Sequence, residues 1–277
     1  MKFLRQVSDL HLDRDTKPRG TRIDQLWYPP PLSDDLETTF VIAGDLWEEC
    51  RFITRKLEDG RSWIATVAEQ FKYVVFVLGN HDLWGRNLPS QYDIVKQKLK
   101  EQGLHNVFLL ERDVVVLDQV KFVGGTLWTD YNKRDPMVML LIPGLIKDQQ
   151  YINFGGGYRK TRPEDFYNIH IKTRDFIFAN ATRDDPDQKV VVITHHAPSR
   201  QSVASRYLEP QWDVLNYGYY TDLETRIHYE GQDIDYWFHG HMHHTDEYFI
   251  GDTKVVLHAR GSPSENAMFD SVKQIAI

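Results

Sequence analysis

A run of histidines near the carboxyl end of the chain consists of a residue type that can bind metal ions. Four imidazoles lie within residues 237–244, directly after apolar residues that predict a buried strand. In an extended segment alternate side chains point to the same side, so His239, His241 and His243 share one face unless Gly240 turns the backbone. Neutral imidazole is the commonest metal ligand in proteins. The segment therefore indicates either a metal site or a polar loop that is rich in histidine by chance.

Other metal-binding residue types follow predicted strands elsewhere in the chain. They are Asp9 and His11 after residues 3–7, Asp45 after residues 38–43, Asn80, His81 and Asp82 after residues 73–78, and His195 and His196 after residues 189–194. Asp9 and His11 are two residues apart, so an extended backbone would aim both side chains at one point. Strands that alternate with helices predict an α/β sheet, whose ligands gather outside the carboxyl ends of the strands. The repeated pattern argues against chance and favours one shared site.

Helices and further strands must position these strand ends. Apolar spacing and a capping-box pattern predict helices within residues 51–71, 88–102 and 161–179. Shorter apolar runs predict strands at residues 107–110, 114–117, 121–124 and 272–277, and a hairpin over residues 247–258. The three runs between 107 and 124 suggest a mixed or antiparallel part of the sheet. His170, inside the last helix, is expected to be structural or exposed. Residues 131–160 are expected to form an irregular, lid-like insertion near the site.

The composition is that of an ordinary globular protein. The chain has 277 residues, of which 41% are hydrophobic and 26% charged, and this suits one large α/β domain or two small ones. Its net charge of −7 disfavours an extended nucleic-acid surface. The single cysteine, Cys50, cannot form an internal disulfide, which fits a reducing compartment. Because no signal peptide or membrane-spanning run is recognisable, we expect a cytoplasmic protein.

The strand-end residues form five motifs in a fixed order. They read Asp9-x-His11, Gly44-Asp45, Gly79-Asn80-His81-Asp82, His195-His196 and Gly240-His241-x-His243. This series resembles the five motifs of the calcineurin-like metallophosphoesterases, and the intervening segments resemble a bacterial branch of small cytosolic phosphoesterases. The resemblance covers residues 1–277 as one domain. It implies an α/β fold, a four-layer α-β-β-α sandwich of two mixed sheets flanked by helices, with two metal ions at the carboxyl ends of the strands.

The resemblance also implies how the metal ions are held. One ion would be held by Asp9, His11 and His243, and the other by Asn80, His195 and His241. Asp45 would bridge both ions. The family uses the first histidine of the pair, which favours His195 over His196 as the ligand. His239 and His244 have no counterpart in the motifs.

Two further motif residues are implied to act on the substrate. His81 would lie beside the phosphate as proton donor or charge stabiliser, oriented by Asp82. Two divalent ions about 3.5–4 Å apart offset the phosphate charge, lower the pKa of a bridging water so that it attacks as hydroxide, and clamp the attacking and leaving oxygens. Mixed nitrogen and oxygen ligands point to manganese, iron, cobalt, nickel or zinc and not to magnesium or calcium alone. The ligand set does not choose among these metals, and manganese is the ion we expect. We therefore expect a hydrolase of small phosphomonoesters or phosphodiesters, a phosphatase or phosphodiesterase.

Two other functions stay open. A metal-dependent nuclease is disfavoured by the acidic charge and by the lack of a basic stretch with interleaved aromatic residues. A non-catalytic metal-binding scaffold is disfavoured because every motif is complete. Outside the motifs, Arg86, Trp128 and Arg260 are candidates for substrate contacts, although a surface salt bridge or a packed aromatic ring explains each equally well. The sequence favours no particular oligomeric state.

Overall fold

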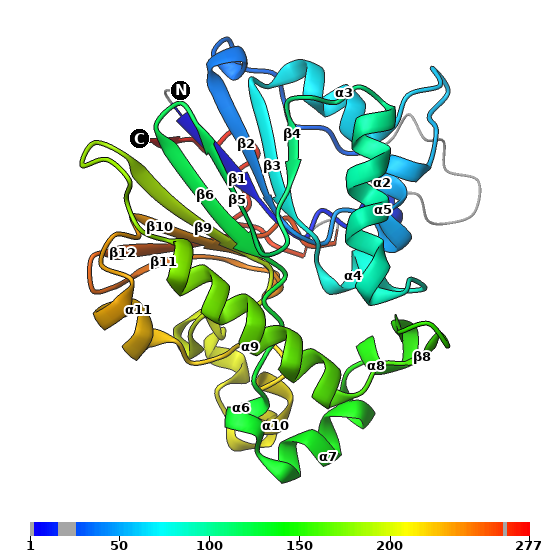
Figure 1. The fold of residues 1–277 in the computed structure, drawn as a ribbon, viewed down its shortest axis with the longest axis vertical. Coiled ribbons are helices and arrows are strands. Elements are labelled where there is room, and N and C mark those ends of the chain that lie inside the picture. Colours follow the sequence, from blue (N-terminus) through cyan, green and yellow to red (C-terminus); the bar gives the residue numbers. More distant parts are fainter. Residues whose placement is uncertain (1–2, 16–25, 263–264) are drawn as a thin grey trace.

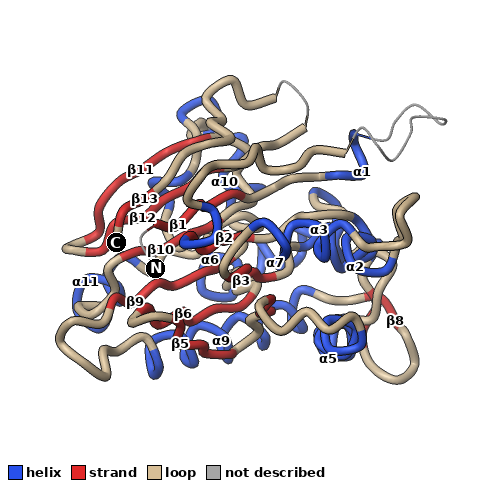
Figure 2. Tube along the Cα trace, turned by 90° about the horizontal axis from the view of Figure 1, so that it is seen from above, coloured by secondary structure: helices blue, strands red, loops and turns tan. Residues whose placement is uncertain are grey.

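Two β-sheets face each other and helices cover their outer faces (Figure 1, Figure 2). The structure is a computed structural model that describes residues 3–15, 26–262 and 265–277. The first sheet has the order β13 (Ile275–Ala276), β1 (Phe3–Val7), β2 (Thr38–Ala43), β3 (Tyr73–Val77), β4 (Val107–Leu109). The second has the order β11 (Thr245–Ile250), β12 (Thr253–His258), β10 (Tyr236–His239), β9 (Lys189–Thr194), β6 (Val120–Gly125), β5 (Asp113–Leu117).

Both sheets are mixed. Strands β1 to β4 are parallel to one another, as are β12, β10, β9 and β6, whereas β13, β11 and β5 pair antiparallel at the edges. The predicted arrangement of two mixed sheets with flanking helices is therefore confirmed. Among the described residues, no helix is long and apolar enough to cross a membrane.

Alternation along the strands builds the layers. In β2, Val41 packs between the two sheets, while Phe40 and Ile42 pack on the other side, in the core that the helices α2 (Arg51–Thr54), α3 (Trp63–Gln70) and α5 (Leu88–Glu101) complete. In β9, Val191 faces the first sheet and Val192 faces the helices α9 (Pro163–Asn180) and α11 (Glu224–Glu230). Strands buried on both faces read as continuous apolar runs. This explains why the sequence predicted the strands β2, β3 and β9.

The strands between residues 107 and 125 differ from the prediction. They do not form one sheet portion, because β4 extends the first sheet parallel to β3, whereas β5 and β6 form an antiparallel hairpin in the second sheet. The chain therefore crosses from one sheet to the other directly after β4. The expected final strand over residues 272–277 is reduced to β13, which pairs with Phe3 and Leu4.

The insertion at residues 131–160 is more regular than the sequence suggested. It contains α6 (Tyr131–Arg134), α7 (Pro136–Leu145), α8 (Asp148–Tyr151) and a pair of short strands, β7 (Asn153–Phe154) and β8 (Arg159–Lys160). The carboxylate of Asp135 accepts hydrogen bonds from the amides of Met137 and Val138, and Pro136 occupies the first turn of α7. This cap and proline start a helix. The expectation of an irregular segment is thus wrong for α7.

His170 provides a test of stability against pH. It is buried in α9, with Nδ1 3.4 Å from the carbonyl oxygen of Trp128, and burial lowers its pKa to about 4. Between about pH 6.5, the pKa in the unfolded chain, and pH 4, His170 is protonated in the unfolded chain but neutral in the folded one. The free energy of unfolding therefore decreases as pH falls through this range. When the pH is lowered from 7.5 to 5.5, the free energy of unfolding measured by urea titration should decrease in both proteins. The decrease should be about 1.4 kcal/mol smaller in His170→Gln than in the wild type. Equal losses would contradict this assignment.

Candidate metal centre

The carboxyl ends of five parallel strands bring the motif residues into two adjacent clusters. Asp9, His11, Asp45 and His243 form the first cluster, and Asp45, His195 and His241 form the second. Within each cluster, one nitrogen or oxygen per residue lies within 4.8 Å of the others. Asn80 adjoins the second cluster, because its Oδ1 lies 3.0 Å from Nε2 of His195. The structure thus assembles all seven residues that the sequence assigned to metal binding.

The separations between these atoms fit shared ligation. Nε2 of His11 lies 3.0 Å from Nε2 of His243, and Nε2 of His243 lies 3.6 Å from Oδ1 of Asp9. Oδ2 of Asp45 lies 3.7 Å from Nε2 of His11 and 3.5 Å from Nε2 of His195. Ligand atoms bound about 2.0–2.2 Å from one cation lie about 3 to 3.5 Å from each other in tetrahedral or octahedral geometry. Each cluster therefore has room for one divalent ion.

Asp45 is the residue that the two clusters share. Its Oδ1 accepts a hydrogen bond from the amide of His81 at 2.9 Å, whereas its buried Oδ2 has no hydrogen-bond partner among the described residues. Burial raises the pKa of the Asp45 carboxyl well above its usual range, and the carboxylates of Asp82 and Asp9 raise it further. An unpartnered buried carboxylate oxygen is costly unless a cation lies next to it. Oδ2 is thus suited to hold a positive charge between the clusters.

Most of the imidazoles are held neutral, which is the form that binds metals. Burial lowers the pKa of His195 to about 4, and it lowers the pKa values of His11 and His241 well below the usual range. His243 differs: burial lowers its pKa, but the hydrogen bond from its Nδ1 to Glu265, 3.1 Å away, and the negative charges of Asp9 and Glu265 together raise that pKa above its usual value. Carboxylates behind ligand histidines orient the ring. Glu265 lies outside the motifs, and no sequence signal pointed to it.

The backbone brings these side chains together differently from the way the sequence argument assumed. Asp9, His11, Asp45, His241 and His243 have φ values of 52°, 42°, 55°, 72° and 52°. This left-handed region is rare for residues other than glycine, and clusters at functional sites. The side chains therefore converge because the chain turns at each of them. The extended backbone expected at Asp9 and His11 is wrong, whereas the turn that the sequence left open after His239 is present.

Close contacts between the strand-end loops hold these turns. Both carboxylate oxygens of Asp9 accept from the amide of His241, at 3.1 and 3.0 Å. A Cβ at Gly79 would lie 2.0 Å from Oδ1 of Asp45, and one at Gly240 would lie 2.6 Å from the carbonyl oxygen of Ala43. The two motif glycines are thus required because the loops touch.

Asp82 does not orient His81 as expected. Its Oδ1 accepts from the amides of Leu46 and Trp47 at 3.0 and 2.9 Å, and its Oδ2 accepts from the amides of Asp45 and Gly79, both at 2.9 Å. A carboxylate that binds four backbone amides has no oxygen directed at the His81 ring. Asp82 instead fixes the loop that carries Asp45.

His81 is held by ring contacts. Its ring stacks on Trp84, with centroids 3.8 Å apart, and meets His11 edge-on at 4.7 Å. Nδ1 lies 3.8 Å from a carboxylate oxygen of Glu48 and makes no hydrogen bond with the described part of the chain. His81 therefore lies beside both clusters, with its Nδ1 buried near the Glu48 carboxylate and its ring fixed by neighbouring rings.

The remaining histidines lie outside the two clusters. Nδ1 of His196 lies 3.2 Å from the carbonyl oxygen of Thr126, whereas its neighbour His195 lies in the second cluster. Nε2 of His239 lies 2.9 Å from Oγ of Ser202, and Nδ1 of His244 lies 3.0 Å from the carbonyl oxygen of Met242. His195 is thus the member of the pair that lies in a cluster, whereas His196 faces a backbone carbonyl. His239 and His244 lie next to the site but belong to neither cluster.

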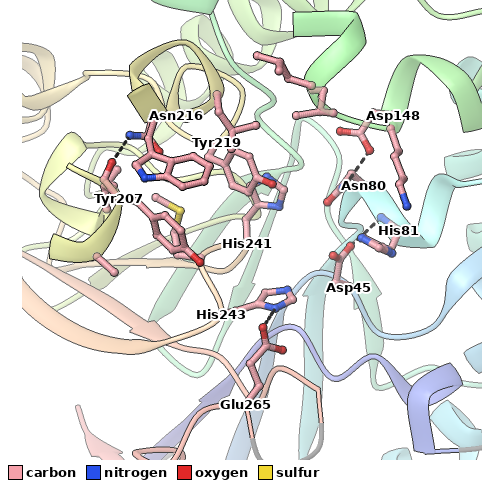
Figure 3. A pocket seen from close by; sticks show the side chains of 18 of the residues that line it. Asp45, Asn80, His81, Asp148, Tyr207, Asn216, Tyr219, His241, His243 and Glu265 are labelled. Carbon is pink, nitrogen blue, oxygen red and sulfur yellow. Dashed lines mark hydrogen bonds and ion pairs between the residues drawn. The ribbon is translucent and has the colours of Figure 1, made fainter. Parts of the chain in front are cut away.

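A cavity of about 510 Å³ opens onto the clusters. In Figure 3, Asn80, His81 and Asp148 lie on one side and Tyr207, Asn216 and Tyr219 on the other, with His241 and His243 between them. The wall also includes the cations Arg14, Lys147 and Arg206, and the aromatic rings of Trp84 and Trp212. The insertion contributes residues 145–148 to this wall.

The three candidates for substrate contacts lie outside that wall and have other partners. Arg260 binds both carboxylate oxygens of Asp15 at 3.0 and 2.8 Å. Trp128 is buried and stacks on Phe166, with ring centroids 4.1 Å apart. Arg86 pairs with Glu49, at 3.5 Å from its carboxylate. Arg260 and Arg86 thus form salt bridges and Trp128 is a packed aromatic ring, which are the alternatives to substrate contact that the sequence left open.

Comparisons with known proteins agree with the geometry. The family described as calcineurin-like phosphoesterase matches residues 4–245. The uncharacterised protein L509 of Acanthamoeba polyphaga mimivirus is 23% identical over 289 residues, covering 100% of this chain and 97% of that protein. The phosphopantetheinyl hydrolase of Mycobacterium tuberculosis superposes with a TM-score of 0.68 at 19% identity, covering 99% of this chain and 95% of that one. These matches leave the bacterial branch as a prediction.

Proposed function

The chain belongs to the calcineurin-like phosphoesterase family, and we propose that it hydrolyses small phosphate esters with two divalent metal ions. The observation that carries this proposal is Oδ2 of Asp45, a buried carboxylate oxygen shared by two clusters of metal-binding side chains. The imidazoles around Asp45 fall into two groups, His11 and His243 in one cluster and His195 and His241 in the other. Two cations, one in each cluster, therefore suit these surroundings better than one.

Each cluster residue has a proposed role. Asp9, His11 and His243 would hold one ion, Asn80, His195 and His241 the other, and Asp45 both. When bound, such ions offset the charge of a phosphate and lower the pKa of a water between them. Manganese suits the mixed nitrogen and oxygen ligands, with iron, zinc, nickel or cobalt as alternatives.

His81 is the proposed proton donor. It lines the cavity next to both clusters, and its ring is fixed by stacking on Trp84. A positioned histidine transfers a proton to a leaving group and speeds such a reaction by about 10²- to 10⁴-fold. Arg14, Lys147 and Arg206 also line the cavity, where their side chains could contact an anionic substrate.

The cavity supports a small organic ester as the substrate. Its volume of about 510 Å³ exceeds what a phosphate group fills, and Tyr207, Trp212 and Tyr219 form an aromatic wall for an organic group. We therefore infer a preference for esters with an aromatic or bulky apolar group. Three cations around one cavity fall short of an extended nucleic-acid groove, so the nuclease function is the weaker alternative.

Hydrolysis assays with defined metal content test this proposal. Purified protein, stripped of metal and reloaded with manganese, should hydrolyse 4-nitrophenyl phosphate or its bis-ester but not linear DNA. Metal should be counted in parallel, and about two ions per chain are expected. Faster cleavage of DNA than of either aryl ester would favour the nuclease. Reloaded protein that binds two ions and hydrolyses neither ester would favour the scaffold.

A further inference from the structure

Asp148 is a buried carboxylate of the insertion that the five motifs do not include. It begins α8, is 4% exposed, and lines the cavity opposite the aromatic wall (Figure 3). Its Oδ1 accepts two hydrogen bonds, one from Nδ2 of Asn80 at 2.9 Å and one from Nε1 of Trp84 at 2.8 Å. A single oxygen atom thus contacts the first residue of α4 (Asn80–Leu83), the helical turn that follows β3, and Trp84 directly after that turn.

The first of these bonds determines which end of the Asn80 amide faces the second cluster. Because Nδ2 donates to Asp148, Oδ1 points toward Nε2 of His195, 3.0 Å away. Only the oxygen of an amide side chain binds a cation, since the NH₂ group offers two hydrogens and no lone pair. Without Asp148, the amide could rotate and present hydrogens to the cluster.

The second bond fixes the ring on which His81 rests. The indole of Trp84 stacks on His81 at a centroid distance of 3.8 Å, and it also stacks on Tyr151 of α8 at 4.8 Å. The Nε1 bond prevents the indole from turning about its side-chain torsions, which would displace the His81 ring. The insertion therefore contacts the site through the carboxylate and through this stack.

We propose that Asp148 is a positioning residue that directs the oxygen of Asn80 toward the second metal ion and holds Trp84 behind His81. This inference rests on the proposed function, because it assumes that Asn80 is a ligand and that His81 acts on the substrate. It assigns the insertion a part in the reaction as well as in the cavity wall. Orientation, and not the charge of the carboxylate, is the property that matters.

Three substitutions separate these effects. Asp148→Leu removes both hydrogen bonds, Asp148→Asn keeps an oxygen that can accept both, and Trp84→Phe removes only the second. Calorimetric titration of metal-free protein with manganese chloride should show the affinity of one of the two sites reduced about tenfold or more in the leucine variant, and both affinities within about threefold of wild type in the other two variants. Trp84→Phe should lower kcat with little change in KM, because it leaves Asn80 in place.

Asp135→Ala is the matched control in the same insertion. It removes the cap of α7 without touching the site, so it should lower stability and leave manganese affinity unchanged. Wild-type affinity in the leucine variant would overturn the proposal, and so would an asparagine variant as weak as the leucine one, which would identify charge as the cause. The titration needs no turnover. If wild-type protein binds manganese yet hydrolyses no ester, the proposed function fails while the role of Asp148 in metal binding is still tested.

Discussion

Asp45→Asn should abolish the binding of both metal ions and lower kcat/KM by at least about a thousandfold. The reason is that Oδ2 of Asp45 lies between the clusters, 3.7 Å from Nε2 of His11 and 3.5 Å from Nε2 of His195. Since Oδ1 accepts from the amide of His81, the new side chain would keep that bond with its oxygen and turn its NH₂ group toward both clusters. Two donors would then face the cations in place of a shared negative charge.

Metal analysis by mass spectrometry after dialysis, with aryl ester hydrolysis in parallel, checks this expectation. Asp35→Asn is the matched control, because Asp35 is also buried but precedes β2, whereas Asp45 follows it. Asp35 pairs with Arg5 at 2.7 Å, so its replacement should reduce stability and leave the metal content unchanged. If Asp45→Asn retained two ions and the wild-type rate, the shared role of Asp45 would be wrong.

The general position of the site could be predicted from the sequence for a topological reason. Parallel strands of one sheet end at the same edge, so polar residues that follow β1, β2 and β3 must lie near each other. Because the second sheet packs face to face with the first, the ends of β9 and β10 reach the same place. This arrangement of two sheets was predicted and is confirmed. Spacing within each motif was the weaker argument. Asp9 and His11 converge through positive φ values, and an extended backbone does not bring them together.

The features that the sequence did not reveal depend on contacts between distant segments. Asp148 is 68 residues from Asn80, and Glu265 reaches His243 from a loop outside every motif. The role expected for Asp82 was wrong for the same reason. Its partners include the backbone amides of residues 45–47, and backbone amides leave no residue-type pattern in a sequence. Arg260 was likewise a plausible phosphate contact until Asp15 proved to hold its guanidinium. Such partners are set by packing, which a single sequence leaves open.

His81→Gln should lower kcat by about 10²- to 10⁴-fold while leaving two metal ions in place. His81 belongs to neither cluster, although its ring meets that of His11 edge-on at 4.7 Å and stacks on Trp84 at 3.8 Å. Glutamine has a similar length and still donates hydrogen bonds, but it cannot give up a proton to a leaving group. The loss should therefore be larger for esters of weakly acidic alcohols, whose leaving oxygen needs a proton, than for 4-nitrophenyl esters.

The same substitution at His244 separates chemistry from general disturbance of the site. His244 follows directly after His243, and its Nδ1 faces the carbonyl oxygen of Met242 at 3.0 Å, so His244→Gln should keep both metal content and rate near wild type. Loss of metal in His81→Gln would instead identify His81 as a ligand. An equal loss of rate for both kinds of ester would show that His81 stabilises charge on the phosphate, because only proton donation makes the loss depend on the acidity of the leaving alcohol.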